Sequence, residues 1–176
     1  MGSRFWGFSL AVYGAEPVQS ECLALQDRFG LDINLVLFCA FVGAMRGITL
    51  TAADIAAARA EVADWHRDIV RSLRAARSHL KTIALEDART TEAAAQLRTR
   101  VKEIELESEY VEHLVLERWA DAQLAERPRG EAREAVAANL QTLLESYGVG
   151  REQLANAEHI AAAALAHAAS RDTGGR

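Results

Sequence analysis

The stretch INLVLFCAFVGAM at residues 33–45 decides the fold. If this segment is a helix, large apolar side chains occupy all of its faces, and a helix without a polar face belongs in the interior of a protein. At 13 residues it is shorter than the ~20 residues that a membrane-spanning helix needs. Asp32 can cap its first turn, and Gly47 follows its end. The segment therefore predicts a buried central helix.

Two short helices are predicted before this segment. Residues 5–13 form the first, which ends at Gly14, and residues 18–29 form the second. Pro17 suits the start of the second helix, and Gly30 suits a left-handed cap at its end. Seven of the eleven aromatic residues lie within the first 41 positions, so this block predicts the part of the core with the largest side chains.

A long helical hairpin is predicted after the central helix. Thr51 and Asp54 resemble a capping box at the start of a helix that reaches about residue 85. After a polar break, Thr91 can cap a second long helix that reaches about residue 126. Apolar residues on the second helix form two neighbouring stripes, at Leu97, Val101, Ile104, Val111 and Val115, and at Leu106, Tyr110 and Leu114. The first long helix has an apolar stripe of its own, at Ile55, Val62, Ile69, Ala76 and Ile83. The stripes on both helices exceed what one hairpin contact needs, which leaves room for a homodimer.

The fold class that follows is all-α. We predict a helical bundle with three short N-terminal helices, a long antiparallel helical hairpin and two C-terminal helices. The single domain covers residues 1–170, with an aromatic-rich block at 5–47, the hairpin at 51–126, a C-terminal pair at 131–169 and a frayed tail at 171–176. The last helix is expected to begin at Arg151. Alanine at 35 positions and only two prolines favour helix throughout.

Composition limits the compartment and the partners. The net charge of −5 excludes a uniformly basic nucleic-acid coat, although a local basic face remains compatible with it. The N-terminus lacks the pattern of a signal peptide, so a cytoplasmic protein without a membrane span is expected. Cys22 and Cys39 lie in apolar runs and form no Cys-x-x-Cys motif, which predicts two reduced, buried thiols.

A basic face on the first long helix is the strongest electrostatic feature. Helical spacing places its cations close together, and they are Arg67, Arg71, Arg74, Arg77 and Lys81. The second long helix carries glutamates at 103, 105, 107, 109 and 112. One interpretation is that the two faces meet as hairpin salt bridges or are solvated surface. The other is a site for an anion, such as RNA, a nucleotide or an acidic partner, with binding that falls steeply with salt.

A polar cluster is predicted near the turn between the second and third helices. Its candidate residues are Gln26, Asp27, Asn34 and Trp65. Buried polar groups need hydrogen-bond partners, so Asp27 and Asn34 are expected to satisfy the backbone of the turn around Gly30. The alternative is a small pocket under Trp65 that binds a ligand or a peptide terminus.

Motifs for chemistry are missing from the sequence. No histidine has a glutamate three residues before it, and the Glu109–His113 pair, one helical turn apart, is interpreted as a surface contact. Ser78 and Lys81 match Ser-x-x-Lys without the motifs that accompany it in penicillin-recognising enzymes. Residues 18–45 superficially suit a helix-turn-helix, but their second helix offers apolar side chains where reading DNA bases needs polar ones. No catalytic, cofactor-binding or metal-binding residue and no cofactor is predicted, so we expect a protein that is not an enzyme.

The N-terminal block resembles a proteobacterial family of small helical proteins, domain-of-unknown-function family 2390. The resemblance rests on residues 5–10 (FWGFSL), Tyr13, residues 22–27 (CLALQD) and residues 34–39, and extends through Trp65, the Leu73-Arg74 step and Asn139-Leu140. A proline usually precedes the Leu-Arg step in that family, whereas this chain has Ser72. The resemblance implies a bacterial cytosolic helical protein of about 160–180 residues and transfers no activity or catalytic residue.

Three functions follow as hypotheses. The first is a non-enzymatic protein-interaction or adaptor module that contacts a protein partner through the basic face or the aromatic block. The second is an RNA- or phosphate-binding module that uses the basic face, and the third is a small-molecule-binding helical protein.

Overall fold

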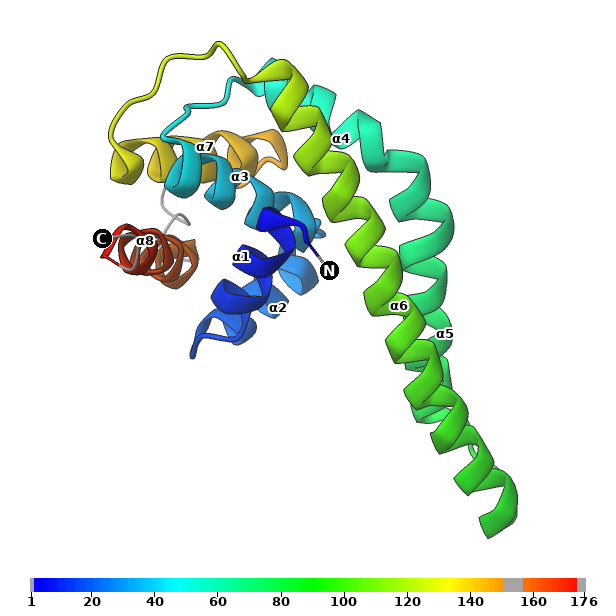
Figure 1. The fold of residues 1–176 in the computed structure, drawn as a ribbon. Coiled ribbons are helices and arrows are strands. Elements are labelled where there is room, and N and C mark those ends of the chain that lie inside the picture. Colours follow the sequence, from blue (N-terminus) through cyan, green and yellow to red (C-terminus); the bar gives the residue numbers. More distant parts are fainter. Residues whose placement is uncertain (1, 151–156, 174–176) are drawn as a thin grey trace.

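A computed structural model describes residues 2–150 and 157–173 of the 176-residue chain (Figure 1). Its elements, in chain order, are α1 (Arg4–Tyr13), α2 (Val18–Phe29), α3 (Ile33–Arg46), α4 (Ala52–Trp65), the π-helical turn η1 (His66–Val70), α5 (Arg71–Thr82), α6 (Ala88–Gln123), α7 (Ala132–Ser146) and α8 (Glu158–Thr173). The described residues form no β-strand, and the prediction of an all-α bundle is confirmed.

Helix α3 is the centre of the core, as its sequence predicts. Its residues from Asn34 to Ala44 are all buried, and α1, α6, α7 and α8 pack around it. The side chain of Asp32 accepts a hydrogen bond from the Asn34 backbone N–H and so caps the helix. Phe5 from α1 packs against the rings of Phe38 and Phe41. The aromatic block therefore supplies the large side chains that surround α3.

The turn between α2 and α3 has the expected left-handed glycine. Gly30 has φ +67°, and its backbone N–H donates to the Gln26 carbonyl. The turn brings Asp32 and Asn34 to the base of the hairpin. Cys22 and Cys39 are both buried and unpaired with each other, in agreement with the sequence, and burial raises the pKa of each thiol to about 12.

The predicted antiparallel hairpin is present, but its first limb is not one continuous α-helix. The capping box of Thr51 and Asp54 starts α4 as expected. The π-helical turn η1 then interrupts the limb, and the Arg71 N–H donates to the carbonyl of His66, five residues earlier. The limb ends at Thr82 rather than near Leu85. The irregularity precedes Ser72, the position where the family resemblance places a proline.

The second limb, α6, begins earlier than predicted. Asp87, and not Thr91, is the cap, because its carboxylate accepts from the Thr90 N–H at 3.0 Å. An aspartate followed by two threonines offers several capping oxygens, so the sequence pattern did not single out one start. The far end of the hairpin extends beyond the other helices (Figure 1). Much of the two predicted apolar stripes is exposed, namely Leu97, Ile104, Leu106, Val111 and Leu114.

Helices α7 and α8 form the predicted C-terminal pair. Residues 151–156, where the last helix was expected to begin, lie outside the described residues. Helix α8 continues to Thr173, past the predicted end near residue 169 and into the predicted tail, of which residues 174–176 also lie outside the described part. None of the described helices combines the length and the apolar character needed to cross a membrane.

Candidate functional site

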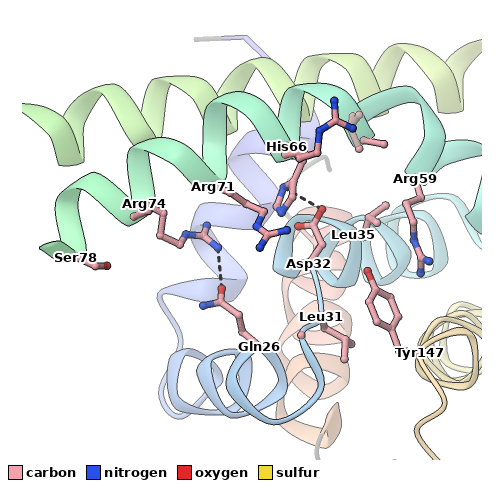
Figure 2. Close-up of a pocket in the computed structure, with 15 residues that line it drawn as sticks. Gln26, Leu31, Asp32, Leu35, Arg59, His66, Arg71, Arg74, Ser78 and Tyr147 are labelled. Carbon is pink, nitrogen blue, oxygen red and sulfur yellow. Dashed lines mark hydrogen bonds and ion pairs between the residues drawn. The ribbon is translucent and has the colours of Figure 1, made fainter.

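A polar cleft of about 750 Å³ lies between the α2–α3 turn, the first limb of the hairpin and the end of α7 (Figure 2). The polar and charged side chains that line it include Gln26, Asp32, Arg59, His66, Arg71, Arg74 and Tyr147. Arg59 stacks over the ring of Tyr147 at 4.2 Å, which forms one wall. Arg71 and Arg74 reach toward the cleft from α5 in Figure 2. We call this space the polar cleft.

Three side chains form a carboxylate–histidine cluster at the floor of the cleft: Asp32, His66 and Glu112. Nδ1 of His66 lies 3.0 Å from Oε1 of Glu112 and 3.3 Å from Oδ2 of Asp32. Asp32 is the cap of α3, His66 opens the π-helical turn, and Glu112 lies on α6. Helix irregularities of the π type occur frequently at functional sites, and here the turn begins with the histidine of the cluster.

Burial shapes the charge of the cluster. Glu112 is fully buried, and its Oε2 accepts a hydrogen bond from the Asn34 side chain at 2.5 Å. Burial, reinforced by the Glu112 carboxylate, raises the pKa of Asp32 to about 6. Burial opposes a charge on His66, but the hydrogen bond that its Nδ1 donates to the Glu112 carboxylate and the charge of Asp32 outweigh it, so the His66 pKa is raised. Two carboxylates thus share one imidazole.

The five cations of the predicted basic face do not form one surface. Arg74 donates to Glu105 at 3.1 Å, to Glu109 at 2.6 Å and to Gln26 at 3.0 Å, and Arg77 also pairs with Glu105. These contacts are the hairpin salt bridges that the first interpretation expects.

The other three cations have different surroundings. Arg67 is exposed and pairs with Asp64 and Asp68 on its own limb. Arg71 and Lys81 have no ion-pair partner among the described residues, and only Arg71 of these two lines the polar cleft. Arg71 is therefore the cation of the face that remains available to an anion in the cleft.

The predicted polar cluster is only partly brought together. Gln26 and Asn34 lie at the base of the hairpin, where they contact Arg74 and Glu112. Asp27 is exposed, and Trp65 does not line the cleft, because its indole N–H donates to the Ser108 carbonyl at 3.0 Å on α6. The expectation that Asp27 and Asn34 satisfy the turn around Gly30 is wrong for both side chains. The turn relies on its own backbone and on Asp32 instead.

The interpretation of Glu109 and His113 as a surface contact is also wrong. His113 is 2 % exposed and stacks on Phe5 with ring centroids 4.2 Å apart. Its Nδ1 lies 2.8 Å from the Glu109 carbonyl and its Nε2 lies 3.0 Å from the Ser9 hydroxyl. Burial lowers the His113 pKa to about 4, so the ring is neutral near pH 7.

Sequence reasoning missed the grouping of Asp32, His66 and Glu112. The three residues are separated by 34 and 46 positions, and no local motif links them. The spacing of the glutamates on α6 was the one signal in the sequence. Glu105 and Glu112 are seven residues apart, so they lie on the same side of α6 and both face the first limb of the hairpin. A glutamate buried between the two limbs requires a hydrogen-bond or ion-pair partner on the first limb.

The fold and the cleft define an all-α protein with a buried polar site at the base of a projecting helical hairpin. The chain belongs to the family described as protein of unknown function (DUF2390), whose model matches residues 4–116. This range includes all three residues of the carboxylate–histidine cluster, and the resemblance inferred from the N-terminal block is confirmed. No curated protein and no solved structure matches the chain.

Proposed function

We propose that this protein is a non-enzymatic interaction module and that an exposed apolar row on α6 is its contact surface. The row consists of Leu97, Ile104 and Val111, which are 43 %, 51 % and 37 % exposed. A seven-residue spacing places them on one side of the helix. Exposed apolar side chains that recur along one side of a helix are a feature of protein contact surfaces, and this row is the observation that carries the proposal.

The occupant we propose for this row is a second copy of the chain. An antiparallel two-fold pairing of α6 centred on Ile104 places Ile104 beside its own copy and Leu97 opposite the partner's Val111. The exposed Arg100 and Glu107 lie four residues before and three residues after the centre. The same pairing therefore brings Arg100 close to the partner's Glu107, twice by symmetry. The row is thus complementary to itself in both apolar character and charge.

Sedimentation velocity over a range of protein concentrations tests this proposal. We expect a monomer–dimer equilibrium for the wild type. Ile104→Glu puts two carboxylates at the centre of the interface, and a loss of about 2 kcal/mol per copy raises the Kd roughly a thousandfold. Leu23→Glu is the matched control, because Leu23 is a similarly exposed leucine on α2, and it should leave the Kd unchanged.

A charge exchange tests the register of the pairing. Arg100→Glu and Glu107→Arg should each raise the Kd by about tenfold, because each places like charges together twice. The double variant should restore the wild-type Kd. A wild type that stays monomeric at every concentration contradicts the proposal, and so does a double variant that binds no better than either single variant.

A second function, binding of a small anionic ligand in the polar cleft, is favoured by one observation. Arg71 lines the cleft and has no ion-pair partner among the described residues. Thermal unfolding with inorganic phosphate or a nucleotide tests it, since a ligand at 100 times its Kd adds about 2.7 kcal/mol of stability. Arg71→Met should abolish the shift, whereas Lys81→Met should keep it.

Binding of RNA through the wider basic face is the remaining alternative. Retention on heparin or RNA at low salt, lost by about 0.3 M salt, would support it. The engagement of Arg74 and Arg77 by Glu105 leaves fewer cations for phosphates than the sequence suggested. We therefore rank it below the two functions above.

A further inference from the structure

The carboxylate–histidine cluster has the spacing of a set of metal ligands. Asp32, His66 and Glu112 each offer one ligand atom, and the three atoms all lie within 4.8 Å of one another. Nδ1 of His66 lies 3.0 Å from Oε1 of Glu112 and 3.3 Å from Oδ2 of Asp32. Bonds of about 2.0–2.2 Å at tetrahedral or octahedral angles place neighbouring ligands about 3.0–3.6 Å apart. The distances from the histidine therefore match two edges of a coordination polyhedron.

Asn34 orients both carboxylates toward the same point. Its backbone N–H donates to Oδ1 of Asp32 at 2.9 Å, and its side chain donates to Oε2 of Glu112 at 2.5 Å. Each carboxylate consequently has one oxygen held by Asn34, and the other oxygen faces Nδ1 of His66. Hydrogen bonds of this kind position the ligands at protein metal sites. The three ligands come from three different elements, because Asp32 caps α3, His66 lies in η1 and Glu112 lies on α6.

The charge of the cluster favours a cation. Glu112 is fully buried and the Asp32 side chain is 10 % exposed, yet only one imidazole stands between them. Of the arginines of α5 that line the cleft, Arg74 is already engaged by Glu105 and Glu109, and Arg71 forms no ion pair with either carboxylate of the cluster. Burial of two carboxylates is unfavourable unless positive charge accompanies them. A divalent ion that displaces the proton of His66 would supply that charge.

The cluster is also open on one side. Asp32 and His66 both line the polar cleft, whereas Glu112 closes the floor from α6. An ion held by three protein ligands would keep further coordination positions for water or a ligand that enters from the cleft.

We propose that Asp32, His66 and Glu112 bind a divalent transition-metal ion at the floor of the polar cleft. One imidazole nitrogen and two carboxylate oxygens, without a thiolate, suit Zn²⁺, Fe²⁺ or Mn²⁺. The imidazole disfavours Mg²⁺ and Ca²⁺, which prefer oxygen ligands alone. This site is separate from the apolar row on α6 and does not depend on dimerisation.

Titration calorimetry of the full chain, freed of metal with a chelator, tests the site with Zn²⁺ and Mn²⁺. We expect one ion per chain. Glu112→Gln keeps the size of the side chain and removes its charge, and it should weaken binding by about 100-fold or more. His79→Gln and Glu103→Gln are matched controls at an exposed histidine of α5 and an exposed glutamate of α6 that takes no part in the proposed pairing. Both should bind as the wild type does.

Asp32→Asn separates the loss of a metal ligand from a loss of folding, because asparagine caps a helix as well as aspartate does. Its circular dichroism should match that of the wild type while its affinity for Zn²⁺ falls. Asn34→Leu should retain one site with an affinity lowered about 10–100-fold, because the Glu112 carboxylate loses its orienting donor. No binding by the wild type overturns the proposal, as does unchanged affinity in Glu112→Gln and Asp32→Asn, or a loss in His79→Gln.

Discussion

The guanidinium of Arg74 on α5 and the carboxylate of Glu105 on α6 join the two limbs of the hairpin, with Nε 3.1 Å from Oε1. Glu105 is 7 % exposed in its side chain, and Arg77 donates to it as well. Arg74 therefore stabilises the contact between the two limbs of the hairpin. Arg71, one turn earlier, lines the cleft and has no such partner among the described residues.

Arg74→Met should lower the free energy of unfolding by about 2 kcal/mol, because Glu105 and Glu109 then lose a partner in a largely buried setting. Arg71→Met should change it by less than about 0.5 kcal/mol, because no described carboxylate depends on Arg71. Urea unfolding followed by circular dichroism measures both variants. Equal losses would contradict the different roles that we assign to the two arginines.

Asn139→Ala should be strongly destabilising. Asn139 is fully buried on α7, where its Oδ1 accepts from the Leu50 N–H at 2.6 Å and its Nδ2 donates to the Cys39 and Ile48 carbonyls. Truncation leaves these backbone groups unsatisfied, so we expect a loss of about 3 kcal/mol in the same assay. Arg133→Ala, at an exposed position of the same helix, should cost no more than about 0.5 kcal/mol.

Gly43→Ala and Gly7→Ala should change stability in opposite directions. A Cβ at Gly43 would lie 2.6 Å from the Val136 backbone nitrogen on α7, so α3 and α7 would have to separate, at a cost of about 3 kcal/mol. A Cβ at Gly7 meets nothing within 4 Å, and alanine in the middle of α1 should add about 0.5–1 kcal/mol. The shift in Tm relative to the wild type reports both effects, and a tolerated alanine at position 43 would refute the close helix crossing.

Acid should destabilise the protein through His113. The folded-state pKa of about 4 lies below the usual value of 6.5, so the unfolded chain takes up a proton first as the pH falls. Stability is therefore lost between about pH 6.5 and 4, by about 3 kcal/mol from this group. Asp32, whose pKa is raised to about 6, acts in the opposite direction within this range.

The comparison with His113→Gln isolates this contribution. The variant is less stable at pH 7, because it loses the ring stacking on Phe5, but its unfolding free energy should fall less steeply between pH 6.5 and 4. Parallel pH profiles for the wild type and the variant would show that His113 does not titrate in this way.

The elements of the fold could be predicted where short-range physical chemistry decides them. Residues 33–45 specify a buried helix because they offer no polar face, and Gly30 and the Thr51–Asp54 capping box mark helix ends through local backbone hydrogen bonds. The start of α6 was placed too late because several neighbouring oxygens can cap a helix there. The π-helical turn at His66 was not predicted, because the capping box and the apolar spacing indicate a helix but do not reveal one extra residue in a single turn.

The candidate site shows the same division between local and long-range interactions. Sequence reasoning named Asn34 as a polar residue in need of a partner and Arg74 as part of a charged face. It did not indicate that Glu112, 78 residues away from Asn34, is the partner, or that His66 lies between that glutamate and Asp32. These contacts depend on how the hairpin is set against α3.

The sequence by itself therefore determined the helices, the hairpin and the buried central segment, because each depends on interactions between residues close along the chain. Only the tertiary structure decided which charges are paired, which apolar residues of α6 remain exposed and where two carboxylates meet a histidine. Side chains from distant segments acquire their partners and their burial when the helices pack, and burial governs both their charge and their availability to a ligand.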